Sequence, residues 1–237
     1  MNIIKHKTLF FIISLLVIIP GTVSLFLWGL RLSIDFTGGT RLNWTVPSAN
    51  EKTATSLKEL FHKNKTDIVT LQRSGTELII RTAPMDQKHH AAILADVKKT
   101  YPTVEEHSYE TIGPTVGQEI TANAIKGIAL ASLFIVLYIA WSFRQVPKPA
   151  SSWRFGWCAI VALLHDVLVV AGVFSLLGHF LHVEIDSLFV TALLTVIGFS
   201  VHDTIVVFDR IRENLKRNYH ISFERVVNDS IIQTLGR

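Results

Sequence analysis

Apolar residues divide the chain into long, almost uncharged stretches and one polar region. The apolar stretches lie at 9–30, 127–143, 155–180 and 188–208. A membrane-spanning helix needs about 20 mostly apolar residues, so each stretch predicts one span. The apolar core of a cleaved signal peptide is shorter, and we therefore predict that 9–30 is an uncleaved span.

The polar region between the first two spans alternates between strand-like and helix-like patterns. Period-two alternation predicts strands at 41–46, 67–72, 77–82 and 103–112. Apolar residues at helical spacing predict helices at 51–62 and 86–99. The order β-α-β-β-α-β is typical of a ferredoxin-like domain, in which helices cover one face of an antiparallel sheet. His89 and His90 are predicted to lie on a solvated helix face, and nothing in the domain indicates catalysis.

The distribution of charge orients these spans. Charged residues make up only 18% of the chain, below the ~25% of an average soluble protein. Short basic segments precede the first span and recur at 144–154 and 209–225, always on the same side of the predicted membrane. Because short basic loops stay in the cytoplasm, we predict a cytoplasmic N-terminus and an extracytoplasmic region 31–120. This topology accounts for the net charge of +4, so no nucleic-acid partner is predicted.

The predicted organisation has four parts. They are an N-terminal tip with the first span at 1–30, a ferredoxin-like domain at 31–120, spans two to four at 121–208, and a cytoplasmic amphipathic segment at 209–237. The fold class is therefore an α-helical multi-pass membrane protein with an inserted α+β ferredoxin-like extracytoplasmic domain. The single cysteine, Cys158, excludes an intrachain disulfide and a cysteine-based zinc site.

Ionisable residues inside the apolar stretches are the candidate functional residues. His165-Asp166 lies in the third stretch and His202-Asp203 in the fourth. Charges in a span are costly and usually functional. Asp166 and Asp203 are each a similar distance from the cytoplasmic ends of neighbouring antiparallel helices, so the two carboxylates are placed to face one another.

Three interpretations of these residues compete. They are polar groups that bridge helices, a metal site of two His and two Asp as in an intramembrane hydrolase, or groups that load and release protons. The metal interpretation is weak because the chain has no HExxH motif and adjacent residues project to different faces of a helix. We favour proton handling, and predict no metal and no cofactor.

Four motifs resemble those of one known family. They are IDFTGGT at 34–40, IGPTVGQEI at 112–120, HDV at 165–167 and GFSVHDTIVVFDRIREN at 198–214. Together they resemble the SecF family of the bacterial Sec protein-export machinery. The resemblance implies a six-span protein of the resistance-nodulation-division type in the inner membrane. It also implies a non-enzymatic subunit that, with SecD and the Sec translocon channel, uses the proton-motive force to release unfolded exported polypeptides.

The resemblance assigns roles to particular residues. Asp203 matches the family's essential membrane carboxylate, and Arg237, within SIIQTLGR, matches its essential arginine in the next span. Asp35, Gly38 and Gly39 match the signature at the entry to the outer domain, and we interpret them as a turn in which glycine permits unusual backbone angles. His202 stands where many relatives are expected to have asparagine, and serves there either as a neutral hydrogen-bonding group or in a proton relay with Asp166 and Asp203.

Two further expectations follow. The family should have two more spans, so the amphipathic segment at 222–235 is expected to lead into a fifth span that this sequence does not contain. The alternative functions are a proton-coupled exporter of small molecules or lipids and a structural scaffold for the translocon. The predicted outer domain at 31–120 has about 90 residues, which is small for the pocket of about 300–1,000 Å³ and the gates that an exporter needs. A scaffold has no need of ionisable Asp203 and Arg237.

Overall fold

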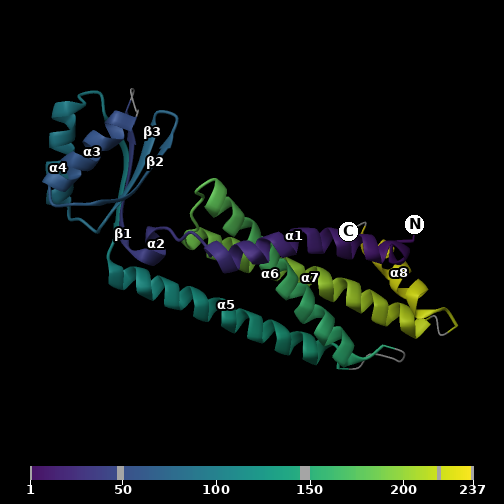
Figure 1. Cartoon of the computed structure of the whole chain (residues 1–237). Helices are drawn as coiled ribbons and strands as arrows, with labels where there is room; N and C mark the ends of the chain where they lie inside the picture. Colours follow the sequence, from purple (N-terminus) through teal and green to yellow (C-terminus); the bar gives the residue numbers. More distant parts are fainter. Residues whose placement is uncertain (1, 47–50, 145–149, 218–219, 236–237) are drawn as a thin grey trace. The chain divides into compact units, whose positions relative to one another are not determined.

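The computed structural model describes residues 2–46, 51–144, 150–217 and 220–235 (Figure 1). The chain divides into two compact units. The helical unit comprises Met1–Arg31 and Ile125–Arg237, and the sheet unit comprises Leu32–Ala124. Each unit has its own set of elements and is described separately below.

Long helices make up the helical unit. They are α1 (Lys7–Trp28, preceded by the short 3₁₀ helix η1, Ile4–His6), α5 (Pro114–Ser142, which starts in the sheet unit), α6 (Ser152–Phe180), α7 (Ser187–Arg217) and the shorter α8 (Phe223–Thr234). Within the described residues, four of them are long and apolar enough to cross a membrane: α1 together with η1, α5, α6 and α7. These helices confirm the four predicted spans. α8 lies within 222–235, the segment predicted to be amphipathic.

Two of the helices extend well beyond their predicted apolar stretches. α5 begins at Pro114 rather than near 127, because proline suits the first position of a helix, where its missing N–H costs nothing. α7 continues past 208 to Arg217, whose Nη2 lies 2.7 Å from Oε1 of Glu213 one turn earlier. Ion pairs at this spacing stabilise a solvated helix, so hydropathy alone underestimates both lengths.

Besides the start of α5, the described residues of the sheet unit form four antiparallel strands, two main helices and one single-turn helix. The strands are β1 (Gly39–Thr45), β2 (Ile68–Ser74), β3 (Glu77–Thr82) and β4 (Glu105–Ile112), and the helices are α2 (Ile34–Thr37), α3 (Glu51–Lys63) and α4 (Gln87–Thr100). The spatial strand order is β2-β3-β1-β4, with every neighbouring pair antiparallel. Helices α3 and α4 cover one face (Figure 1). This arrangement confirms the predicted ferredoxin-like plan.

Apolar side chains from both layers form the core of the sheet unit. Trp44 of β1 and Phe61 of α3 are both 0% exposed, and their ring centroids lie 5.7 Å apart. Leu42 and Ile80 come from the central strands, and Ile93 of α4 belongs to the same buried cluster. The alternating pattern of the strands therefore points one set of residues at the helices, as period two requires.

The prediction of a solvated histidine pair on α4 is wrong. His90 is only 7% exposed, and its Nε2 lies 2.6 Å from Oε1 of Glu106 on β4. The same carboxylate oxygen accepts a hydrogen bond from the indole of Trp44 at 3.1 Å. His89 is half-buried, with Nε2 2.7 Å from the backbone oxygen of Asn64. The imidazoles tolerate burial because partners that are distant in sequence satisfy them.

Tyr109 makes the stability of the sheet unit depend on pH. Burial, together with the negative charges of Asp86 and Glu106, raises the pKa of the Tyr109 hydroxyl above its ordinary value. The hydroxyl donates to the backbone oxygen of Met85 at 2.8 Å. Since the unfolded chain loses this proton first, the free energy of unfolding should fall as pH rises above about 10.

Urea unfolding of the fragment 32–124, followed by circular dichroism between pH 8 and 11, tests this. Tyr109→Phe should show a shallower loss of stability with rising pH, because it has no proton to lose. Equal pH dependence in both proteins would contradict the argument. We also predict that this unit folds by itself without metal. A fragment that stays unfolded, or folds only with zinc, would contradict that prediction.

Candidate functional site in the membrane helices

Helices α1 and α6 pack side by side along a seam of small and polar residues. Contacts between them recur at a constant sequence offset of 151 residues, so the two helices run parallel. At the middle of the seam, a Cβ atom added to Gly21 would lie 2.9 Å from Cα of Gly172. Next to it the buried hydroxyls of Ser24 and Ser175 are 2.7 Å apart. Small residues allow such close approach in membrane helices, so α1 and α6 pack closely against each other.

A chain of hydrogen bonds joins three membrane helices at the HDV motif. Nε2 of His165 lies 2.6 Å from the hydroxyl of Ser14 on α1, and its Nδ1 lies 2.8 Å from Oδ1 of Asp166. The other carboxylate oxygen of Asp166 accepts a hydrogen bond from Ser200 on α7. Asp166 and His165 therefore have partners on both sides, and the motif connects α1, α6 and α7.

These hydrogen bonds are chemically compatible with two of the three interpretations, proton handling and a polar bridge between helices. A neutral imidazole that donates from Nδ1 to Asp166 accepts at Nε2 from the Ser14 hydroxyl. An imidazole takes a proton on one nitrogen and releases it from the other, so the arrangement fits proton transfer. It equally fits a polar bridge that holds three helices together.

Asp203 and His202 lie on an exposed face of α7. Within residues 2–46, 51–144, 150–217 and 220–235, neither side chain has a hydrogen bond or an ion pair. No hydrogen bond joins the two carboxylates there. Asp166 accepts a hydrogen bond from Ser200, which lies three residues before Asp203 on the same helix. An unpaired carboxylate in a span is costly. Arg237 lies outside the described residues.

The described part of the chain brings no three His, Cys, Asp or Glu side chains together as metal ligands. The interpretation as an intramembrane metal hydrolase therefore finds no ligand set there.

The glycines of the 34–40 motif are required by the backbone. Gly38 and Gly39 have φ values of +71° and +125°, which confirms the predicted turn with backbone angles that favour glycine. A Cβ atom on Gly38 would lie 3.0 Å from Cα of Pro114, at the start of α5. One on Gly117 would lie 2.9 Å from the backbone nitrogen of Gly38. The motif that contains Asp35 thus packs directly against the 112–120 motif, which includes the first turn of α5.

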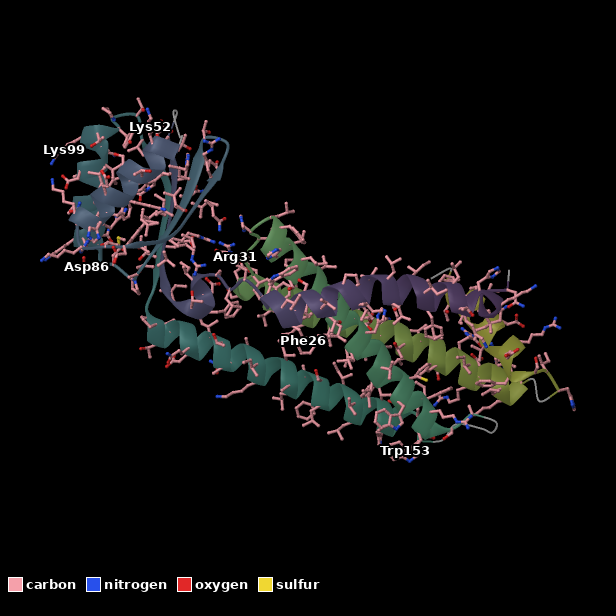
Figure 2. All side chains as sticks on the ribbon, viewed as in Figure 1. Phe26, Arg31, Lys52, Asp86, Lys99 and Trp153 are labelled. Atoms are coloured by element: carbon pink, nitrogen blue, oxygen red, sulfur yellow. The ribbon has the colours of Figure 1, made fainter. Side chains whose placement is uncertain are left out.

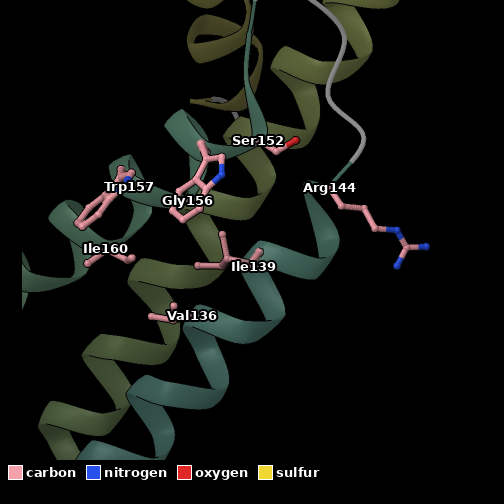
Figure 3. Close-up of a pocket in the computed structure, with 9 residues that line it drawn as sticks. Val136, Ile139, Arg144, Ser152, Gly156, Trp157 and Ile160 are labelled. Atoms are coloured by element: carbon pink, nitrogen blue, oxygen red, sulfur yellow. The ribbon is translucent and has the colours of Figure 1, made fainter.

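The helical unit also contains an apolar pocket. The rings of Phe143, Phe155 and Phe208 pack together between α5, α6 and α7. Beside them α5 and α6 enclose an open pocket of about 450 Å³, whose lining Figure 3 shows to be aromatic and aliphatic apart from Ser152 and Arg144. Arg144 extends away from the pocket in this view. The described residues in its wall include no carboxylate or imidazole.

Sequence reasoning missed the two serines of the hydrogen-bonded chain. Ser14 and Ser200 are single hydroxyls in apolar helices, where serine is common and carries little information by itself. A usable signal was the offset between α1 and α6, since Ser14, Gly21 and Ser24 are matched 151 residues later by His165, Gly172 and Ser175. The shared spacing of small and polar residues indicates two parallel faces in contact.

Comparisons with known proteins agree with this architecture. Residues 92–237 match the family model described as protein export membrane protein SecD/SecF, C-terminal. The SecF protein translocase subunit of Thermobaculum terrenum is 46% identical, with 100% of this chain and 77% of that protein covered. The SecF subunit of Anaerolinea thermophila is 38% identical with the same coverage.

Solved structures of larger relatives give the same result. A crystal structure of SecDF from Thermus thermophilus, described as a translocon-associated membrane protein, matches with a TM-score of 0.80 and 30% identity. The match covers 100% of this chain but 31% of that one. A structure of SecDF in a form described as super-membrane-facing matches with a TM-score of 0.63 and 32% identity.

Four spanning helices, an inserted ferredoxin-like unit and ionisable residues within the spans define a multi-pass membrane protein of the resistance-nodulation-division type. Two findings identify the family within this class. The sequence identity to a SecF subunit and the structural match to SecDF both extend over the whole of this chain. The chain belongs to the SecF family of protein translocase subunits.

Proposed function

We propose that this chain works with SecD and the Sec translocon channel, and uses the proton-motive force to promote late translocation and release of exported polypeptides. The observation that carries the proposal is Asp203, a carboxylate in a membrane helix with no partner in the described part of the chain. A group in that position gains stability by taking up a proton or by meeting a cation, and loses it when the cation leaves. Family membership supplies the context of protein export.

Arg237 is the proposed cation. When its guanidinium approaches Asp203, the ionised carboxylate is stabilised, and when it withdraws, the carboxylate takes up a proton from the outer side. His202, which is next to Asp203, and Asp166 complete the proposed set of proton-coupling residues. Moving one charge through 100 mV releases about 2.3 kcal/mol, and reversing a 1:99 equilibrium takes about 5.5 kcal/mol. One or two protons, helped by a pH difference, therefore suffice to switch the protein between two conformations.

The sheet unit is the proposed contact for the exported chain. Its strand order leaves β2 and β4 at the edges of the sheet, and edge strands bind extended polypeptides through main-chain hydrogen bonds. This step is mechanical, so we assign the protein no enzymatic reaction. The proposed contact requires the sheet unit to lie on the outer side of the bacterial inner membrane, where exported chains emerge.

The orientation that this function needs has the N-terminus and residues 144–154 in the cytoplasm, and residues 31–120 outside. Its support is the placement of short basic segments on one side. In a Cys158→Ser background, a membrane-impermeant thiol reagent added to intact cells without an outer-membrane barrier should label Lys58→Cys and leave Arg144→Cys unlabelled. Lysis should make both reactive, which controls for accessibility. Labelling of Arg144→Cys alone in intact cells would reverse the orientation.

An export assay tests the function itself. A strain without its own SecF would receive this chain, both as it is and lengthened to match its relatives, and release of a secreted reporter would be measured with and without a proton gradient. Export that rises with the gradient and fails in Asp203→Asn supports the proposal. Restoration that ignores the gradient would favour a structural scaffold, and efflux of small molecules without protein export would favour an exporter.

A further inference from the structure

An open pocket of about 560 Å³ lies where α1 and α6 end, at the far end of α1 from the N-terminus. Both helices contribute to its wall, which is lined by Leu27, Trp28, Gly29, Arg31, Ser175, Gly178, His179 and His182. Figure 2 labels Arg31, just beyond the end of α1. Among the described residues, the wall contains one arginine and two histidines, and no acidic side chain. The pocket therefore offers hydrogen-bond donors.

Arg31 is fixed in place but keeps donors available. Its backbone oxygen accepts a hydrogen bond from the backbone of Ile185 at 2.8 Å, which ties the end of α1 to the segment after α6. Nη1 lies 2.8 Å from Nδ1 of His182, and Nε lies 3.6 Å from Oε1 of Glu184. Within the described residues Nη2 has no partner. The guanidinium is thus held rigidly with one edge unoccupied.

The two imidazoles add donors beside this edge. Because Nδ1 of His182 accepts from Arg31, the ring proton of neutral His182 lies on Nε2, which has no partner in the described part of the chain. His179 stacks on Trp28, with ring centroids 3.7 Å apart and planes 6° from parallel. Its ring nitrogens likewise have no hydrogen bond among residues 2–46, 51–144, 150–217 and 220–235. Rigid donors that are already oriented favour the binding of an anion.

The surface around the pocket is apolar and exposed. Phe26 is 87% exposed, and Leu27, Phe180 and Leu181 are 66–68% exposed at the ends of the same two helices. Trp28 has the position of an aromatic residue at a membrane interface. A cationic pocket bordered by lipid-facing side chains at the end of two spans lies at the depth of phospholipid headgroups.

We propose that this pocket binds the phosphate of an anionic phospholipid, whose acyl chains lie against the apolar ends of α1 and α6. Arg31 contacts the phosphate oxygens with its unoccupied edge, and His179 and His182 donate from either side. Among the described residues that line the pocket there is no carboxylate, and the adjacent Glu184 is already paired with Arg31. No acidic partner is therefore left for the amine of a zwitterionic headgroup, so phosphatidylglycerol is bound in preference to phosphatidylcholine. This site depends on the spans lying in a bilayer, and is independent of proton coupling.

Native mass spectrometry of the whole chain, purified in detergent with added phosphatidylglycerol or phosphatidylcholine, tests the proposal. The wild-type chain should retain phosphatidylglycerol preferentially. Arg31→Gln should weaken that retention about tenfold or more, as expected for loss of a charge-assisted hydrogen bond. His179→Phe keeps the stacking on Trp28 and removes the ring nitrogens, and should also weaken retention. Arg144→Gln removes an arginine that lies over Trp141 elsewhere in the unit, 5.0 Å from the ring centroid, and should retain lipid as the wild type does.

Three outcomes would overturn the proposal. The first is equal retention of both lipids, and the second is equal retention by the wild type and His179→Phe. The third is displacement of phosphatidylglycerol by millimolar inorganic phosphate, which would show a site for a free anion rather than a lipid. Folding of Arg31→Gln is checked by a disulfide between Ser24→Cys and Ser175→Cys in a Cys158→Ser background, since these side chains meet in the α1–α6 seam. If that variant does not form the disulfide, His179→Phe decides the result.

Discussion

Asp203→Asn should reduce proton-dependent export to the level of cells without SecF, while the protein still inserts, folds and accumulates normally. Asparagine has almost the same shape as aspartate but cannot take up or release a proton in the physiological range. In the described part of the chain Asp203 has no hydrogen bond that the substitution would break, so stability should change little. Export of a reporter across membrane vesicles, with and without a proton gradient, measures the effect.

Two variants serve as comparisons for Asp203→Asn. Asp203→Glu keeps a titratable group and should retain part of the activity. Asp166→Asn changes the carboxylate that contacts His165 and Ser200, and should lower stability by about 1.5–3 kcal/mol, the usual contribution of a charged hydrogen bond. If Asp203→Asn exports at the wild-type rate under a proton gradient, the coupling proposal is wrong, and His165 and Asp166 serve only as a polar bridge between helices.

Gly172→Ala should destabilise the helical unit by about 1–3 kcal/mol, the usual cost of overpacking. A Cβ atom at this position would lie 2.7 Å from Cα of Gly21, and a backbone atom cannot turn aside as a flexible side chain does. The helices must therefore separate, which lengthens the contact between Ser24 and Ser175. Thermal unfolding in detergent, and the yield of a disulfide between cysteines placed at the two serines, measure the change.

Gly156→Ala is the matched control for this substitution. Gly156 lies on the same helix, but a Cβ atom there would meet nothing within 4 Å. Alanine in a helix interior normally stabilises by about 0.5–1 kcal/mol relative to glycine, so the two substitutions should have opposite signs. A Gly172→Ala protein as stable as the Gly156→Ala protein would show that α1 and α6 do not pack at this point.

The elements of the fold were largely predictable because they follow from local patterns. Uncharged stretches located the four spans, and alternation with turn signals located the strands and helices of the sheet unit. The lengths of α5 and α7 were not, since their polar turns are stabilised by Pro114 and by ion pairs rather than by hydropathy. His90 was misjudged because its partner, Glu106, is on another element.

The candidate site divides in the same way. Asp166 and Asp203 stand out in the sequence because a charge in an apolar helix has a high energetic cost. The hydrogen bonds of Asp166 were not predictable, since Ser14 and Ser200 come from helices that meet it only after the chain has folded. Likewise, Gly38 is recognisable as a turn residue, but its close approach to Pro114 depends on tertiary packing.

The constant offset of 151 residues between α1 and α6 has a consequence for biosynthesis. At about 5–20 residues per second, α1 leaves the ribosome roughly 8–30 s before the residues that it will contact. During this interval it must persist in the bilayer without its partner, and the absence of charge between residues 9 and 30 lets it do so. The hydroxyls of Ser14 and Ser24 wait for partners until α6 is inserted. Assembly of the seam is therefore a late step, and a ribosome that stalls before α6 leaves a nascent chain whose first helix is inserted but unpaired.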